Sequence, residues 1–193
     1  MNLPNKLTLM RIILVPFFML FLYWNIPFHF TIALVIFAAA SITDALDGNI
    51  ARKRNLVTTF GKFADPLADK ILVLAAFACL ADVLNGEIVN GVVVTIIAAR
   101  EFMVSGLRLV TAEKGVVVAA GIWGKLKTAF TMVAISLLLI CLVLAKDFNI
   151  TLSTTADNII TGILAALVWI SVLLTIISGA IYLKGYSKYI DMK

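Results

Sequence analysis

Residues 30–81 read FTIALVIFAAASITDALDGNIARKRNLVTTFGKFADPLADKILVLAAFACLA, two apolar runs joined by a short basic segment. A helix needs about 20 apolar residues to cross the hydrocarbon core of a bilayer, and each run comes close to that length. Because the joining segment is short, the two helices are expected to run antiparallel as a hairpin. Four aspartates flank the joint, so the hairpin would bring their carboxylates to the same end.

The rest of the chain repeats this pattern of apolar runs and short polar breaks. The 193 residues are 62% hydrophobic, with a mean hydropathy of +1.07, which is far outside the range of soluble domains. We therefore predict an all-α polytopic membrane protein with six transmembrane helices in one bundle, formed by a single domain that covers residues 1–193. The helices are expected at about residues 7–25, 30–50, 61–81, 88–109, 126–145 and 158–182.

The charged residues indicate how this bundle is oriented. An even number of crossings places both termini on one side, and Lys and Arg gather at the helix ends on that side, which makes it cytoplasmic by the positive-inside rule. The basic positions are Lys6, Arg11, Arg52, Lys53, Arg54, Lys62, Lys114, Lys125, Lys127, Lys184, Lys188 and Lys193, whereas the opposite breaks carry Asp82, Glu87, Lys146, Asp147 and Asp157. The net charge of +5 thus suits anionic lipids or phosphorylated substrates, and we expect no nucleic acid partner because no soluble basic domain is present.

The four aspartates of the hairpin have helical spacing. Asp44 and Asp47 are three residues apart, and Asp65 and Asp69 are four apart, so on helices each pair projects from one face. Four unpaired negative charges at membrane depth would be costly, and divalent cations would compensate them. Carboxylate ligands without Cys or His favour Mg²⁺ or Mn²⁺ over zinc. We therefore predict a metal site at the cytoplasmic end of the hairpin.

Cysteine and histidine chemistry is not expected in this chain. Cys79 and Cys141 each lie alone inside an apolar run, where helix packing is the ordinary role of a cysteine. His29, the single histidine, lies beside Pro27 at an expected helix boundary. Histidine-based catalysis is therefore nearly excluded.

Small and basic residues lie between the aspartates. Gly48, with Ala51 close behind it, leaves a helix face on which a bulky ligand can approach the backbone, and Gly61 could do the same on the facing helix. Arg52 is suited to bind phosphate oxygens. Each residue alone also fits solvation or ordinary positive-inside charge, but the whole set with its spacing predicts a site for a nucleotide diphosphate.

These residues match the signature D-x2-D-G-x2-A-R-x8-G-x3-D-x3-D at every fixed position: Asp44, Asp47, Gly48, Ala51, Arg52, Gly61, Asp65 and Asp69. The chain therefore resembles the CDP-alcohol phosphotransferase family over essentially its whole length. The resemblance implies that a homodimer in the cell membrane transfers a phosphatidyl group from CDP-diacylglycerol to a small alcohol and releases CMP, with the active site facing the cytoplasm. It also implies two divalent ions bound by the first three aspartates, with Asp69 as general base and also close to a metal.

The remaining cations are expected to bind the acceptor alcohol. Arg100 and Arg108 are eight residues apart and so lie near one face of a helix, and Lys125 and Lys127 begin the next helix. Together they predict a pocket for a phosphate on the acceptor, which favours glycerol 3-phosphate or inositol phosphate over serine, choline or ethanolamine. Snorkelling or topology would explain Lys127 equally well, and Glu101 is expected to pair with a neighbouring cation.

Three further segments, residues 2–8 together with Arg11, 99–102 and 124–128, resemble bacterial members of the family that use glycerol 3-phosphate, which implies a bacterial cytoplasmic membrane. Within the first of them, Asn5 and Thr8 could help to bind the cytidine diphosphate end of the lipid. A helix N-cap is the alternative role for one of these two residues.

Two other classes of function explain the sequence less well. A cation-coupled transporter or channel would spread its acids through the bilayer or repeat its broken helices, whereas here the acids gather at one end of one hairpin without a second copy. A structural or scaffolding membrane protein would leave the aspartate set without a reason. We therefore expect an enzyme.

Overall fold

The computed structural model describes residues 3–54, 59–113 and 121–186; its description of side chains omits residues 3–4, 44–54, 59–63, 65, 66 and 113. All secondary structure in these ranges is helical, as predicted. The elements are α1 (Leu3–Tyr23), α2 (His29–Arg54), α3 (Thr59–Val83), α4 (Gly91–Glu113), α5 (Ile122–Leu142), the π-helical turn η1 (Val143–Asp147) and α6 (Thr154–Tyr186).

Each predicted apolar run corresponds to one of these helices, and the differences lie at the ends. Helix α4 begins at Gly91, three residues later than predicted, because the Asn90 side chain accepts a hydrogen bond from the Val93 amide (3.1 Å) and caps the helix. Helix α6 begins earlier than predicted, because the Ser153 hydroxyl accepts from the Ala156 amide (3.3 Å). Polar caps, which a hydropathy run does not contain, therefore set these boundaries.

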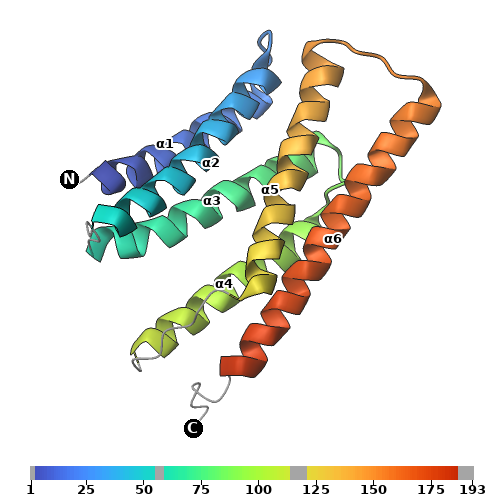
Figure 1. Cartoon of the computed structure of the whole chain (residues 1–193). Coiled ribbons are helices and arrows are strands. Elements are labelled where there is room, and N and C mark those ends of the chain that lie inside the picture. Colours follow the sequence, from blue (N-terminus) through green and yellow to red (C-terminus); the bar gives the residue numbers. More distant parts are fainter. Residues whose placement is uncertain (1–2, 55–58, 114–120, 187–193) are drawn as a thin grey trace.

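Successive helices run in opposite directions. Figure 1 shows the first turn of α1, the end of α2 and the start of α3 at the left of the molecule, and the end of α4, the start of α5 and the end of α6 at the bottom, with the α1–α2 and α5–α6 loops at the top. The end of α2 and the start of α3 lie close together at the left. The expected hairpin is therefore present in the backbone.

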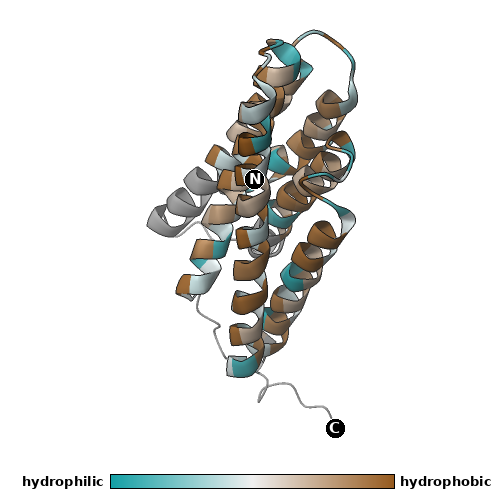
Figure 2. Cartoon of the chain, turned by 90° about the vertical axis from the view of Figure 1, so that its right-hand side faces the viewer, coloured by the Kyte–Doolittle hydropathy of each residue, from teal (hydrophilic) through white to brown (hydrophobic). Residues whose placement is uncertain are grey.

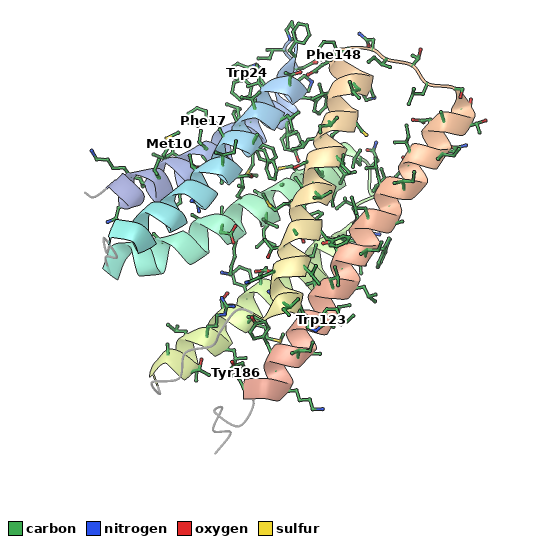
Figure 3. All side chains as sticks on the ribbon, viewed as in Figure 1. Met10, Phe17, Trp24, Trp123, Phe148 and Tyr186 are labelled. Atoms are coloured by element: carbon green, nitrogen blue, oxygen red, sulfur yellow. The ribbon has the colours of Figure 1, made fainter. Side chains whose placement is uncertain are left out.

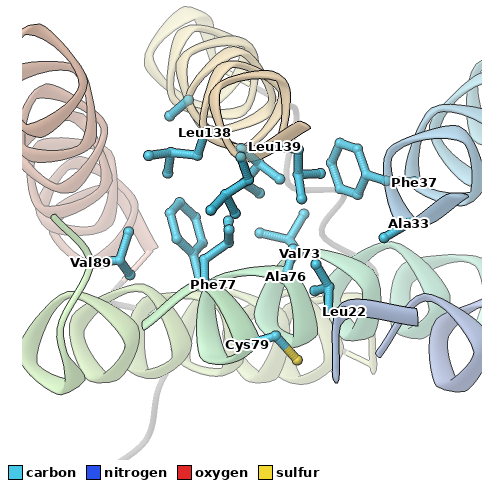
Figure 4. Packing of buried hydrophobic residues seen from close by; sticks show 14 of the residues in the cluster. Leu22, Ala33, Phe37, Val73, Ala76, Phe77, Cys79, Val89, Leu138 and Leu139 are labelled. Atoms are coloured by element: carbon cyan, nitrogen blue, oxygen red, sulfur yellow. The ribbon is translucent and has the colours of Figure 1, made fainter. Parts of the chain in front are cut away.

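The main apolar core surrounds α3. Leu22 of α1 and Phe37 of α2 meet Phe77 and Ala76 of α3, and Leu139 of α5 covers them (Figure 4). Ala76 has no exposed surface, and such small residues let helices approach closely in a membrane. Cys79 is buried in the same core, in agreement with its expected packing role, and Cys141 is half-buried and free.

The outer surface of the helices is also apolar. Figure 2 shows hydrophobic residues along most of the helical length, and Figure 3 shows Met10 and Phe17 directed away from the bundle. In the described part of the chain, three helical segments are long and apolar enough to cross a membrane: Asn5–Tyr23, Ile122–Asp147 and Thr154–Tyr186, with a shorter apolar segment at His29–Thr43. These are the helices of a membrane protein.

A partly buried hydrogen-bonded contact joins η1, at the end of α5, to the start of α2. The π-helical turn η1 ends at Asp147, whose Oδ2 accepts hydrogen bonds from the Thr31 amide (2.6 Å) and the Thr31 hydroxyl (2.7 Å). Thr31 lies in the first turn of α2, where amides have no intrahelical acceptor and a negative charge is favourable. Beside it, the rings of Phe28 and Phe148 meet edge to face at 5.8 Å. Asp147 therefore caps α2 from a distant part of the chain.

We predict that Asp147→Ala lowers the free energy of unfolding by about 1–2 kcal/mol, because the first turn of α2 loses its acceptor. Thermal unfolding in detergent would measure this change. Glu87→Ala is the matched control, since Glu87 is an exposed acid in the α3–α4 connection. Equal melting temperatures for the two variants would contradict the capping role.

Candidate functional site

The four signature aspartates lie on the two helices of the hairpin. The backbone positions of Asp44 and Asp47 belong to the second half of α2, and those of Asp65 and Asp69 to the first half of α3. Only Asp69 has a described side chain, so the expected convergence of the four carboxylates, and the roles of Gly48, Ala51, Arg52 and Gly61, fall outside the described residues. Within the described set no three His, Cys, Asp or Glu side chains are grouped to bind a metal. The donor set itself, carboxylates on two helices that meet at one end, has the oxygen chemistry that Mg²⁺ or Mn²⁺ requires.

Asp69 and the four predicted cations line a single cavity of about 540 Å³, which we call the cation cavity. Its walls come from α3, α4, α5 and α6. The lining residues are Asp69, Lys70, Val73, Arg100, Glu101, Val104, Ser105, Arg108, Gly124, Lys125, Lys127, Thr128, Ala129, Thr131 and Tyr182. The structure thus brings together residues that are far apart in the sequence and that were selected as candidates for different roles.

Glu101 is the anionic centre of the cation cavity. Arg100 Nη1 donates to Glu101 Oε1 at 3.2 Å, and Lys127 Nζ donates to the same oxygen. Glu101 and Lys127 are both buried, so each charge compensates the other in a poorly hydrated place. The expected pairing of Glu101 is confirmed. Topology alone does not account for Lys127, because a snorkelling side chain would be exposed and this one is 5% exposed.

The two arginines of α4 also contact α6. Arg100 Nη2 donates to the Ser178 hydroxyl at 2.6 Å, and Arg108 Nη2 donates to the Tyr182 hydroxyl at 3.2 Å. Lys125 is exposed at the rim of the cavity. Of the four predicted cations, Arg100 and Arg108 thus have partners on α6, Lys127 is paired with Glu101, and Lys125 is exposed.

Sequence reasoning did not find three residues at this site: Lys70, Ser178 and Tyr182. Lys70 directly follows Asp69 and lines the same cavity. Ser178 and Tyr182 are buried on α6, where they continue a polar series with Ser171 and Thr175 at spacings of three or four residues. Such a series on one face of an apolar helix is a signal that could have identified α6 as a wall of the site.

At the other end of the chain, Asn5 and Thr8 are buried on one face of α1, with exposed fractions of 7% and 0%. Arg11, three residues further, is also fully buried. Helix α1 begins at Leu3, so Thr8 lies in its second turn and Asn5 inside its first. The N-cap alternative is therefore wrong for both residues, and the buried polar face of α1 remains a candidate surface for the cytidine diphosphate.

A family model matches residues 1–177 and carries the description CDP-alcohol phosphatidyltransferase. The chain belongs to this family. The signature between residues 44 and 69 predicts membership of the CDP-alcohol phosphatidyltransferase family, and the match confirms this prediction. The matched residues include both the aspartate hairpin and the arginines of α4. Ser178 and Tyr182 lie just beyond the matched residues.

Relatives within the CDP-alcohol phosphatidyltransferase family extend over most of the chain. Proteins named CDP-diacylglycerol–glycerol-3-phosphate 3-phosphatidyltransferase include one from Bacillus subtilis (strain 168), 41% identical over 190 residues, covering 92% of this chain and 91% of the relative. One from Rickettsia bellii (strain RML369-C) is 42% identical over 188 residues and 97% of each chain. One from Escherichia coli (strain K12) is 42% identical over 140 residues, covering 72% of this chain and 76% of the relative.

We predict that Glu101→Gln destabilises the protein by about 3–5 kcal/mol, because it leaves the Lys127 ammonium buried without a counter-charge. Adding Lys127→Met to Glu101→Gln should restore part of this loss, and thermal unfolding of the single and double variants in detergent would measure the coupling. Lys125→Met, which removes an exposed lysine of the same cavity, should change stability little. Additive effects of Glu101→Gln and Lys127→Met would contradict the pairing.

Proposed function

We propose that this protein transfers the phosphatidyl group of CDP-diacylglycerol to glycerol 3-phosphate, giving phosphatidylglycerophosphate and CMP. The observation that carries the proposal is the cation cavity, in which the signature residue Asp69 shares one cavity with Arg100, Arg108, Lys125 and Lys127. A general base next to a cluster of cations suits an acceptor that carries both a hydroxyl and a phosphate. The names of the relatives support the same substrate pair.

The chemistry follows from the residues that line the cavity. Arg100 and Arg108 would bind the acceptor phosphate, and Asp69 would accept the proton of the attacking hydroxyl. The hydroxyl oxygen forms a bond to the lipid-side phosphorus while the bond from that phosphorus to the CMP oxygen breaks, and CMP leaves with the electron pair. Such a transfer depends on positioning and charge stabilisation more than on a protein nucleophile. The described cavity lining, which holds no His or Cys, suits this direct displacement.

Two divalent ions, Mg²⁺ or Mn²⁺, would be held by Asp44, Asp47, Asp65 and Asp69. When bound, they would neutralise the pyrophosphate and stabilise CMP as the leaving group. Of these carboxylates, Asp69 has a described side chain and is half-buried at the cavity wall. It is thus suited to act between the ions and the acceptor.

The CDP end of the lipid would bind on the hairpin side of the molecule. We assign this role to Asn5 and Thr8 on α1, and to Gly48, Ala51, Arg52 and Gly61 of the signature. The packing of α1 against α2 and α3, the two helices that carry the signature, supports the assignment. Adjacent sites for the two substrates would leave Asp69 between them.

In the cell the protein would be a multi-pass homodimer of the bacterial cytoplasmic membrane, with six crossings. Both termini and the cation cavity would face the cytoplasm. The alternating helix directions in Figure 1, and the basic residues Lys125 and Lys184 at the lower ends of α5 and α6, support this orientation. The acceptor is water-soluble, so a cavity on this side receives it directly.

We predict that the purified protein in detergent releases CMP from CDP-diacylglycerol when glycerol 3-phosphate and Mg²⁺ are supplied, and that excess EDTA abolishes the release. A panel of inositol phosphate, serine and unphosphorylated glycerol in place of glycerol 3-phosphate tests the acceptor. Faster release with inositol phosphate or serine would change the assigned acceptor. Absence of release with every alcohol would remove the enzymatic function.

Asp69→Asn should lower turnover by about 10²–10⁴-fold, because an amide cannot accept the hydroxyl proton. Stabilisation of the protein by CDP-diacylglycerol in a thermal-shift assay should be largely preserved. Asp157→Asn is the control, since Asp157 is exposed in the first turn of α6 far from the cavity. A wild-type rate for Asp69→Asn would show that another group takes the proton.

A further inference from the structure

Helix α6 contacts both arginines of the cation cavity through residues spaced four apart. Ser178 accepts from Arg100 Nη2 at 2.6 Å, and Tyr182 accepts from Arg108 Nη2 at 3.2 Å. The Tyr182 ring also lies near both guanidinium groups, with its centroid 5.7 Å from Arg100 Cζ and 5.5 Å from Arg108 Cζ. One aromatic ring therefore interacts with two cations two helical turns apart on α4.

Tyr182 connects α4 to the start of α5 as well. Its hydroxyl accepts a hydrogen bond from the Gly121 amide at 2.9 Å, directly before α5 begins at Ile122. A Cβ added at Gly124 would lie 3.4 Å from the same hydroxyl oxygen, so the phenol packs closely against the first turn of α5. Tyr182 is 5% exposed, and its orientation is fixed by contacts from both helices.

The backbone of α6 also approaches Arg100 closely. A Cβ added at Gly179 would lie 3.1 Å from Arg100 Cγ and 3.3 Å from Met103 Cε. A glycine is therefore needed for the aliphatic part of Arg100 to pack against α6 in its present position. Ser178, Gly179 and Tyr182 together limit where both guanidinium groups can lie.

We propose that Tyr182, supported by Ser178 and Gly179, is a positioning residue that orients Arg100 and Arg108 toward the acceptor phosphate and so determines the affinity for a phosphorylated acceptor. The inference rests on the proposed function. Free arginine side chains lose rotamer entropy when they bind a ligand, and arginines already held by α6 lose less. All three residues follow the segment that matches the family model, so the family signature gives them no role.

Tyr182→Phe tests the proposal, because it removes the hydroxyl but keeps the ring near both arginines. The KM for glycerol 3-phosphate should rise about tenfold, the effect of one hydrogen bond to a charged group, while kcat and the KM for CDP-diacylglycerol stay within about twofold. Tyr186→Phe is the matched control: Tyr186 lies one turn further on α6 and stacks on Tyr182 at 6.3 Å, but it does not line the cavity. It should leave all three constants unchanged.

A double-mutant cycle separates positioning from general loosening of the fold. Arg108→Ala should raise the KM for glycerol 3-phosphate far more than the KM for CDP-diacylglycerol. Adding Tyr182→Phe to Arg108→Ala should raise the KM for glycerol 3-phosphate by much less than the tenfold expected for Tyr182→Phe alone, because the hydroxyl then has no Arg108 guanidinium to orient. Full additivity would overturn the proposal.

Gly179→Ala gives an independent test at Arg100. The new methyl group would push on Arg100 Cγ, so the acceptor KM should rise selectively, whereas Gly185→Ala on the same helix meets nothing within 4 Å and should be silent. If Tyr182→Phe does not fold, Ser178→Ala should give the same selective rise through Arg100.

The outcomes distinguish this inference from the function on which it rests. If the wild-type protein releases no CMP with glycerol 3-phosphate, the proposed function fails. If the wild type is active and Tyr182→Phe raises neither KM, or raises both equally, only the positioning role fails. Stabilisation of each variant by glycerol 3-phosphate in a thermal-shift assay gives a second reading that does not need turnover, and an unchanged stabilisation of Tyr182→Phe would also overturn the role.

Discussion

A charge buried among apolar helices must have a partner, and the cation cavity depends on this constraint. The Glu101 carboxylate receives hydrogen bonds from Arg100 and Lys127, and so it joins α4 to α5 inside the bundle. Arg108 lies about two turns further along α4 and lines the same cavity. Asp69, the last residue of the signature, lines the same cavity from α3. The arrangement of the proposed site therefore depends on an ion pair between two helices.

The two parts of the molecule are held together by different forces. Around α3 a large apolar core joins α1, α2 and α5, whereas the cluster between α4 and α6 at the cavity contains only Val104, Leu107 and Tyr182 as buried members among the described residues. Hydrogen bonds from Arg100 to Ser178 and from Arg108 to Tyr182 also join the two helices there. The groups that would bind substrate thus also hold the helices together, which links stability to activity at this end of the protein.

Hydropathy was sufficient to predict the helices, because each helix is apolar over most of its length, on both its buried and its exposed faces. It was not sufficient for their ends, which Asn90 and Ser153 set through hydrogen bonds. The spacing of Arg100 and Arg108 on one helix, and the position of the lysines at the start of the next, were enough to anticipate a shared cavity. Ser178 and Tyr182 were missed because their contacts join helices 70 to 80 residues apart in sequence, and helical periodicity describes only contacts within one helix. That the carboxylates of Asp44, Asp47 and Asp65 converge with that of Asp69 stays a prediction.

The π-helical turn η1 has a consequence for length variation in the family. The Phe148 amide bonds to the Val143 carbonyl five residues back, which is equivalent to one residue inserted into the end of α5. Each residue of an α-helix is rotated by about 100° from the previous one. A homologue that lacks this residue would therefore direct the carboxylate at position 147 away from the first turn of α2. In such a homologue the first turn of α2 would need a different acceptor.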